Sequence, residues 1–152
     1  MNYKYLSREN LKLFQIFERK ISKDFLKFRK PSSKRSNLKS YISNKNKLML
    51  LVTDKDKIIG YQAFSINGKR ARLIGAGVLR EYRRKGIAKS LITKALNQMK
   101  KRKVKRVISR TWESNLASRA LLEGFGFKKY KVIKRDRING EASEWYKLDL
   151  SQ

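Results

Sequence analysis

The 152-residue sequence contains no cysteine and no histidine, and it has a single proline. Without cysteine there can be no disulfide, and without either residue the usual ligands of a structural zinc site are missing. The absence of histidine also excludes a Ser-His-Asp or Cys-His triad and any imidazole base. Any chemistry must therefore use carboxylates, tyrosines, the backbone or bound water.

Acidic residues are also scarce, since 12 Asp and Glu stand against 40 Lys and Arg and give a formal net charge of +28. An excess of this size favours contact with polyanions such as nucleic acid, an anionic membrane or a phosphorylated cofactor. The alternative is a lysine-rich proteome in which the charge mainly maintains solubility. The positive charge is spread along the chain rather than gathered in one tail, so both interpretations stay open.

Long apolar runs are missing as well. The longest, such as residues 48–52, are far too short to span a bilayer, and residues 1–30 lack the apolar core of a signal peptide. We therefore expect a cytoplasmic protein with no membrane partner. Apolar residues make up 40% of the chain, which is enough for a single folded domain over residues 1–152.

Apolar periodicity predicts the order of the secondary-structure elements. The N-terminal part is expected to form a helix after Ser7, a loop around Pro31 and a short helix over residues 36–43. Strands are expected over residues 48–53, 58–66, 70–79 and 104–110, helices over 86–103 and 114–123, and a final hairpin over 127–134 and 144–150. A meander followed by alternating helices and strands predicts a mixed α/β (α+β) fold, with a mixed sheet packed against helices.

A basic segment, Arg-Arg-Lys-Gly-Ile-Ala-Lys over residues 83–89, lies where a strand passes into a helix. A helix N-terminus offers unpaired backbone N–H groups and a partial positive charge, and both favour bound phosphate. Gly86 and Ala88 keep the backbone accessible, and cationic side chains surround it. A pyrophosphate is the natural ligand of such a turn. For an isolated match, a basic helix start with a solvated face is the alternative.

A second segment follows beyond the next strand and reads Asn115-x-x-Ser118-x-x-Leu121-Leu122-x-x-x-Gly126-Phe127. Together the two segments resemble the Arg/Gln-x-x-Gly-x-Gly/Ala and Asn-x-x-Ala-x-x-Leu-Tyr-x-x-x-Gly-Phe signatures of the GNAT superfamily of N-acetyltransferases, in the same order and separation. The resemblance covers roughly residues 45–150. It implies a GNAT-like fold, in which a mostly antiparallel central sheet splays between the strand that ends at Leu79 and the strand that begins at Val104.

The resemblance implies an acetyl-CoA-dependent N-acetyltransferase in which an amine attacks the thioester directly, in a ternary complex. The acceptor would be a protein N-terminus, a lysine or a small-molecule amine, and the oxyanion would meet a backbone N–H near Leu79. The resemblance also implies which residues bind the cofactor. Val78, Leu79 and Arg80 would lie along the pantetheine arm, and Asn115 near the pantetheine end. The pyrophosphate would be surrounded by Arg83, Arg84, Lys85, Gly86, Ile87, Ala88 and Lys89.

Leu122 departs from the family pattern, because most members carry there a tyrosine that protonates the leaving thiolate. A leucine cannot donate a proton, so Tyr130 and Tyr146 are candidate substitutes, with ordinary strand aromatics as the alternative. Glu113 is the candidate general base, directly or through water. Its alternative role is that of a carboxylate at a helix N-terminus, where it suits the helix dipole.

Three small residues, Gly75-Ala76-Gly77, occupy one predicted strand, although glycine weakens strands. They indicate either room for the thioester and acceptor, or a bulge or close packing against a helix. Two other functions also stay open: a CoA-binding domain without turnover, and a basic protein that binds nucleic acid or the ribosome on the same fold. No metal is expected, and the protein is expected to be a monomer or homodimer.

Overall fold

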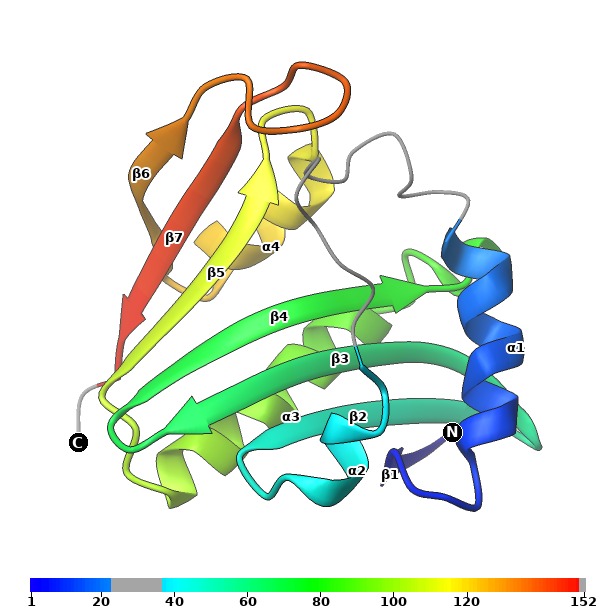
Figure 1. Ribbon diagram of the computed structural model, residues 1–152. Coiled ribbons are helices and arrows are strands. Elements are labelled where there is room, and N and C mark those ends of the chain that lie inside the picture. The colour runs from blue at the N-terminus through cyan, green and yellow to red at the C-terminus, as the bar shows by residue number, and fades with distance from the viewer. Residues whose placement is uncertain (23–36, 151–152) are drawn as a thin grey trace.

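The computed structural model describes residues 1–22 and 37–150, so Pro31 and the loop predicted around it lie outside the described residues. The strands form one sheet in the order β1-β2-β3-β4-β5-β7-β6 (Figure 1). They are β1 (Asn2–Tyr5), β2 (Lys47–Asp54), β3 (Lys57–Asn67), β4 (Arg70–Val78), β5 (Arg106–Trp112), β6 (Lys128–Ile133) and β7 (Ser143–Asp149). The helices are α1 (Leu11–Ser22), α2 (Ser40–Ser43), α3 (Ile87–Lys101) and α4 (Leu116–Gly124), with a 3-10 turn, η2 (Arg80–Tyr82).

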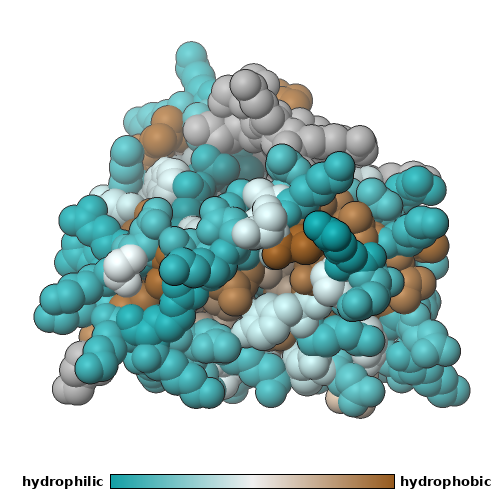
Figure 2. Space-filling model, turned by 60° about the horizontal axis from the view of Figure 1, so that its bottom comes forward, coloured by the Kyte–Doolittle hydropathy of each residue, from teal (hydrophilic) through white to brown (hydrophobic). Residues whose placement is uncertain are grey.

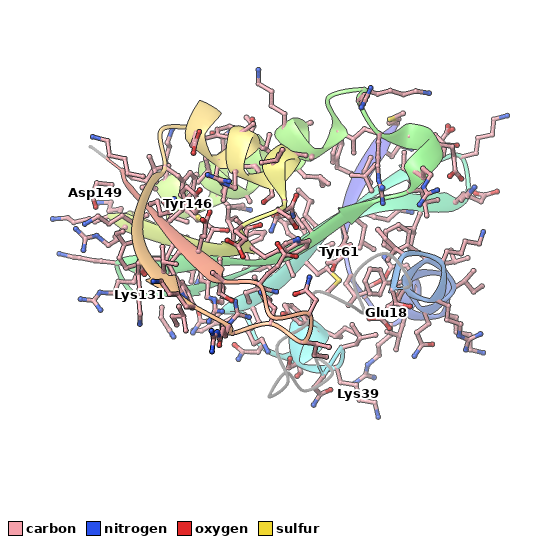
Figure 3. The ribbon with its side chains drawn as sticks, turned by 90° about the horizontal axis from the view of Figure 1, so that it is seen from above. Glu18, Lys39, Tyr61, Lys131, Tyr146 and Asp149 are labelled. Atoms are coloured by element: carbon pink, nitrogen blue, oxygen red, sulfur yellow. The ribbon has the colours of Figure 1, made fainter. Side chains whose placement is uncertain are left out.

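The helices cover both faces of the sheet, with α1 and α2 on one face and α3 and α4 on the other (Figure 3). The apolar stripe of α1 buries Phe14 and Phe17 against the sheet, where both rings meet Tyr61 of β3 edge-on. On the opposite face α3 buries residues at helical spacing, among them Leu91 and Ala95. The predicted mixed α/β fold, with a mostly antiparallel sheet between helices, is confirmed.

Two elements differ from the sequence prediction. The edge strand β1 is absent from that prediction, because four residues with only Tyr3 partly buried give too short an alternation to detect. The Tyr3 hydroxyl donates to Ser90 of α3 over 2.8 Å and so ties this strand to the helix behind it. The predicted helix over residues 36–43 is shorter, since α2 begins at Ser40. A turn precedes α2, in which the Asn37 side-chain oxygen accepts a hydrogen bond from the Lys39 N–H.

The sheet splits between β4 and β5, as Figure 1 shows. These parallel strands pair only over Arg70–Leu73 and Arg106–Ser109. Beyond that point β4 continues along β3 to Val78, while β5 continues along β7 to Trp112. The expected splay is therefore confirmed, and we call the opening between residues 74–78 of β4 and residues 110–112 of β5 the fork.

A bulge marks the start of the fork. Phe64 of β3 pairs with Leu73, whereas Ala63 pairs with Gly75, so Ile74 is an extra residue in β4. Gly77 lies under α1, where a Cβ would come within 2.3 Å of the Ile21 Cδ1 atom. Both structural explanations of the Gly75-Ala76-Gly77 sequence, a bulge and close packing against a helix, are thus present, and the same residues also line the fork.

Hydrophilic side chains cover most of the face shown in Figure 2, with smaller apolar areas between them. Within residues 1–22 and 37–150, no helix combines the length and the apolar character needed to cross a bilayer.

Candidate functional site

The turn before α3 exposes the start of that helix. Gly86 is the N-cap residue with a left-handed φ of 78°, and the first helical hydrogen bond runs from the Ser90 N–H to its carbonyl over 3.0 Å. The N–H groups of Ile87, Ala88 and Lys89 precede that bond, so they point out of the helix end. A Cβ at Gly86 would meet nothing within 4 Å. The turn is therefore open beside Gly86, and an open turn at a helix N-terminus fits a bound pyrophosphate.

The cationic side chains of the turn are exposed but do not all point outward. The Arg83 Nε donates to the Val78 carbonyl over 2.9 Å, so this side chain folds back onto the end of β4. The Lys85 ammonium lies 5.4 Å from the ring centroid of Tyr82. Arg84 and Lys89 are exposed beside it, and Arg80 lies earlier in the exposed turn η2. The turn thus carries concentrated positive charge next to an open helix end.

The backbone of β4 alternates between β3 and the fork. The Leu79 N–H donates to the Ile59 carbonyl of β3 over 2.9 Å, so it is not available to a ligand. By antiparallel alternation, Ala76 and Val78 direct their N–H and C=O groups toward the fork. The Arg83 contact with the Val78 carbonyl agrees with that direction. The sequence singled out Ala76 only as one of three small residues, although strand alternation from Val78 would have identified its backbone as facing the fork.

Asn115 occupies the N-cap of α4, and its Oδ1 accepts from the Ser118 N–H over 3.1 Å. Its predicted cofactor contact would therefore have to use the Nδ2 donors. Leu122 is buried in the core and contributes no polar group. α4 thus offers an amide at its start but no proton donor at the position of the family tyrosine.

The two tyrosines considered as substitutes lie elsewhere. Tyr146 is fully buried in β7, where its hydroxyl donates to Glu144 over 3.2 Å and accepts from Arg119 over 3.4 Å. Tyr130 lies on the edge strand β6, beyond β7 from the fork, with its ring beside the Lys147 ammonium. Both therefore have the structural roles that were the alternative interpretation.

Glu113 lies just past β5 and is exposed. Its Oε1 accepts from the Ala142 N–H over 3.1 Å, and its own N–H donates to the Ala142 carbonyl over 3.3 Å. These bonds fasten the end of β5 to the segment before β7. The structure thus gives Glu113 an architectural role, and its part in catalysis stays a prediction.

Tyr61 was not singled out from the sequence. It pairs with Gly77 across β3 and β4, and its hydroxyl lies 3.4 Å from where a Cβ of Gly75 would be. Burial raises the pKa of Tyr61 to about 12, and the nearby Glu18 carboxylate contributes to the rise. The hydroxyl is therefore a neutral hydrogen-bond donor beside the fork. A large polar residue opposite two glycines was the signal that could have revealed it.

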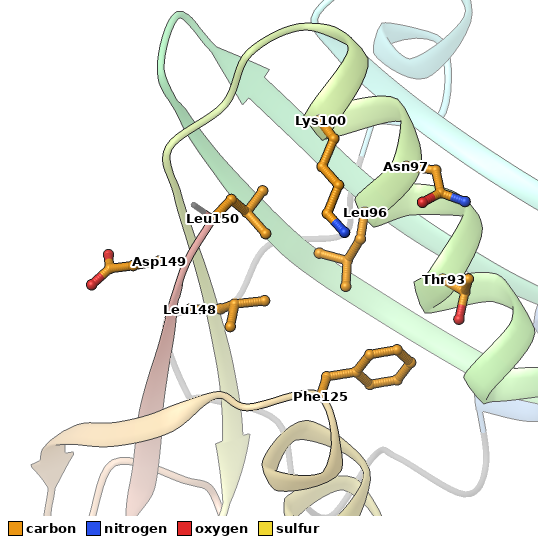
Figure 4. Close-up of a pocket in the computed structure, with 8 residues that line it drawn as sticks. All are labelled: Thr93, Leu96, Asn97, Lys100, Phe125, Leu148, Asp149 and Leu150. Carbon is orange, nitrogen blue, oxygen red and sulfur yellow. The ribbon is translucent and has the colours of Figure 1, made fainter. Parts of the chain in front are cut away.

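A hollow of about 280 Å³ lies between α3 and the end of β7 (Figure 4). Leu96 and Lys100 of α3 face Leu148 and Leu150 across it, and Phe125 closes one side. None of the predicted cofactor residues lines it, so this hollow is separate from the turn and the fork.

Comparison with known proteins gives a consistent result. The sequence profile of the Acetyltransferase (GNAT) family matches residues 13–127. The chain is 30% identical over 103 residues to N-alpha-acetyltransferase 30 of Schizosaccharomyces pombe, and the aligned region covers 62% of this chain and 67% of that protein. It is 35% identical over 74 residues to an N-alpha-acetyltransferase of Saccharolobus solfataricus, covering 48% of this chain and 44% of that one. A chain in the crystal structure of the NatC complex bound to Gag peptide and CoA is similar with a TM-score of 0.78 and 21% identity, over 99% of this chain and 98% of that chain.

Proposed function

This chain belongs to the acetyltransferase (GNAT) family, and from that premise we propose that it acetylates the α-amino group of a protein or peptide N-terminus. As a member of this family it is an N-acetyltransferase that uses acetyl-CoA. The names of the two relatives, both N-alpha-acetyltransferases, support the α-amine as acceptor. The observation that carries the proposal is the fork itself, because it opens beside the exposed start of α3.

The turn and the fork together suit a pyrophosphate joined to a long polar arm. The N–H groups of Ile87, Ala88 and Lys89, with the cationic turn around them, would hold the pyrophosphate. The open edge of β4 would pair with the pantetheine arm at Ala76 and lie along it at Val78, and Asn115 would contact it through Nδ2. Arg83 contributes by fixing the Val78 carbonyl.

Acetyl-CoA supplies an activated acetyl group: an N–C bond forms while the thioester C–S bond breaks, the amine loses a proton and the sulfur gains one. The chain's contribution is to orient the reactants and to stabilise negative charge on the carbonyl oxygen. The N–H that faces the fork beside Leu79 is that of Val78, and we assign it this second task.

The shortage of bases favours an acceptor that is easily deprotonated. The chain has no histidine, and the Glu113 carboxylate is engaged by Ala142. An α-amino group with a pKa of about 7.7–8.0 is about half neutral at pH 8, whereas a lysine with a pKa of about 10.4 is almost fully charged. An N-terminal amine can therefore attack with little help, which supports it over a lysine side chain.

Two matched peptides test the proposal. One has a free N-terminus and no lysine, and the other has a blocked N-terminus and one internal lysine. With acetyl-CoA and the full chain, CoA release and mass spectrometry should show acetylation of the first peptide only. Transfer to the lysine alone would overturn the choice of acceptor. Tight CoA binding by calorimetry without transfer to any amine would instead favour a CoA-binding protein without turnover.

A further inference from the structure

We infer that the acceptor carries an acidic side chain close to its free amine, and that Arg72 and Arg110 bind its carboxylate. The inference rests on the proposed function, since it assigns the substrate class of the same fork. Both arginines lie at the base of the fork. Arg72 is next to Leu73, the last residue of β4 that pairs with β5, and Arg110 is the first residue of β5 beyond that pairing.

The indole ring of one tryptophan contacts both guanidinium groups. Trp145 of β7 pairs directly with Arg110, whose Cζ lies 5.3 Å from the indole centroid. The Cζ of Arg72 lies 5.0 Å from the same centroid. Contact with an aromatic face restricts an arginine side chain while leaving its N–H donors free for a planar anion. The two cations are therefore positioned before any ligand arrives.

Among the described residues, no carboxylate neutralises these two guanidinium groups by direct contact. Within residues 1–22 and 37–150, no carboxylate forms an ion pair with Arg72 or Arg110, and the buried Nε of Arg72 has no hydrogen-bond partner there. Burial, and next the positive charge of Arg72, lowers the pKa of Arg110. The negative charge of Asp136 acts to raise the pKa of Arg110. The Asp136 Oδ2 already accepts a 2.6 Å hydrogen bond from the Ser143 hydroxyl. A bound carboxylate would satisfy the donors and offset the repulsion between the two guanidiniums.

The cationic surface continues away from the fork. Arg72 also lines a hollow of about 440 Å³ between α2 and the neighbouring ends of β2, β3 and β4. Lys47 lies in its wall, with its ammonium 4.6 Å from the Tyr41 ring centroid, and asparagine side chains supply further polar groups. Among the residues that the structure describes, no acidic one lines this hollow. Its chemistry suits an acidic peptide and disfavours a basic one.

At the other end of the fork, a carboxylate lies on the α1 side, while Arg83 lies at the end of β4. The carboxylate of Glu18 on α1 acts on the hydroxyl of Tyr61 (Figure 3). That hydroxyl lies beside Gly75, and the Tyr61 ring lies beside Gly77. An acceptor is therefore favoured with its amino terminus toward Glu18 and Tyr61 and its negative charge toward Arg72. Arg72 and Gly77 are five residues apart, which is about 16 Å along a strand at about 3.3 Å per residue. An extended acceptor would thus place its carboxylate within its first five residues.

Three peptides test the inference, identical except for glutamates, glutamines or lysines at their second to fourth positions. With the full chain we expect kcat/KM for the glutamate peptide to exceed that for the glutamine peptide by about tenfold, mainly through KM, because charge-assisted hydrogen bonds are strong. The lysine peptide should be the poorest. Arg72→Gln and Arg110→Gln should each reduce the preference for glutamate over glutamine, and Arg72→Lys should restore it only in part.

Arg106→Gln is the matched control, because Arg106 also lies on β5 but pairs with Asp149 at the exposed end. It should leave the preference unchanged, and activity on the glutamine peptide shows that each variant is folded. Equal kcat/KM for glutamate and glutamine would overturn the inference and leave the proposed function standing. A preference that survives in both arginine variants would also overturn it. Transfer to lysine side chains only would instead overturn the proposed function.

Discussion

At the scale of single residues, the turn before α3 depends on the backbone of Gly86 rather than on the room around it. Its left-handed φ of 78° costs a residue with a Cβ about 1–2 kcal/mol, which glycine avoids. Arg84 has a φ of 62° in the same turn, but the other non-glycine residues with positive φ in the described chain are also lysines or arginines. Backbone strain at Arg84 is therefore not in itself a sign of function.

Gly86 and Gly68 form a matched pair for mutation, since both have positive φ and neither would place a Cβ within 4 Å of another atom. Gly86→Ala and Gly68→Ala should each lose about 1 kcal/mol of stability, measured by chemical denaturation. Only Gly86→Ala should weaken CoA binding, by about tenfold in calorimetry, because it strains the left-handed backbone that directs the N–H groups at the start of α3. Equal CoA affinity in the two variants would show that the pyrophosphate lies elsewhere.

At the scale of elements, β4 has three tasks along nine residues. It pairs with β3 along its length, pairs with β5 only at its start, and exposes Ala76 and Val78 after the bulge at Ile74. On its other side α1 approaches so closely that Gly77 has no room for a side chain. The position of α1 and the opening of the fork are therefore coupled through one glycine.

A double-mutant cycle tests this coupling. Gly77→Ala should destabilise the protein by about 1 kcal/mol, because the added Cβ would lie 2.3 Å from the Ile21 Cδ1 atom. In an Ile21→Val background, which lacks that atom, the same change should cost at least about 0.5 kcal/mol less. Chemical denaturation of the four proteins gives the coupling energy. Additive effects would mean that α1 does not limit this position.

At the scale of the whole molecule, the net charge of +28 acts on every anionic ligand. Charges at the protein surface raise the local concentration of an opposite charge and are screened by salt over about 10 Å at 0.1 M. Acetyl-CoA and an acidic acceptor would both be attracted, whereas a polycationic acceptor would be repelled. The charge therefore supports the proposed acceptor class without creating the site.

The electrostatic attraction between the protein and acetyl-CoA can be measured, because the donor carries phosphates. Raising the salt concentration from about 0.05 to about 0.5 M should increase KM for acetyl-CoA several-fold through screening. The acetyl thioester of pantetheine, which lacks the phosphates, serves as the control, and its KM should change little. A salt response of the same size for both donors would show that the cationic turn does not recognise phosphate.

Most elements could be predicted from the sequence, because helix and strand periodicities are local properties of the chain. The turn over residues 83–89 and the segment from Asn115 to Phe127 also indicated the family, since their order and spacing are properties of the sequence alone. Predictions were poorest where local signals are weak, as in the four-residue β1 and the start of α2.

Which residues line the fork could not be predicted from local patterns in the sequence. Tyr61, Ala76, Arg110 and Trp145 belong to four strands and meet only through pairing register. A shift of one residue turns a side chain to the other face of a sheet, so the bulge at Ile74 decides which residues of β4 lie beside Tyr61. The sequence by itself therefore determined the family and identified the turn to which we assign phosphate binding. Only the tertiary structure decided which side chains face the acceptor, because strand pairing brings together residues that are far apart in the chain.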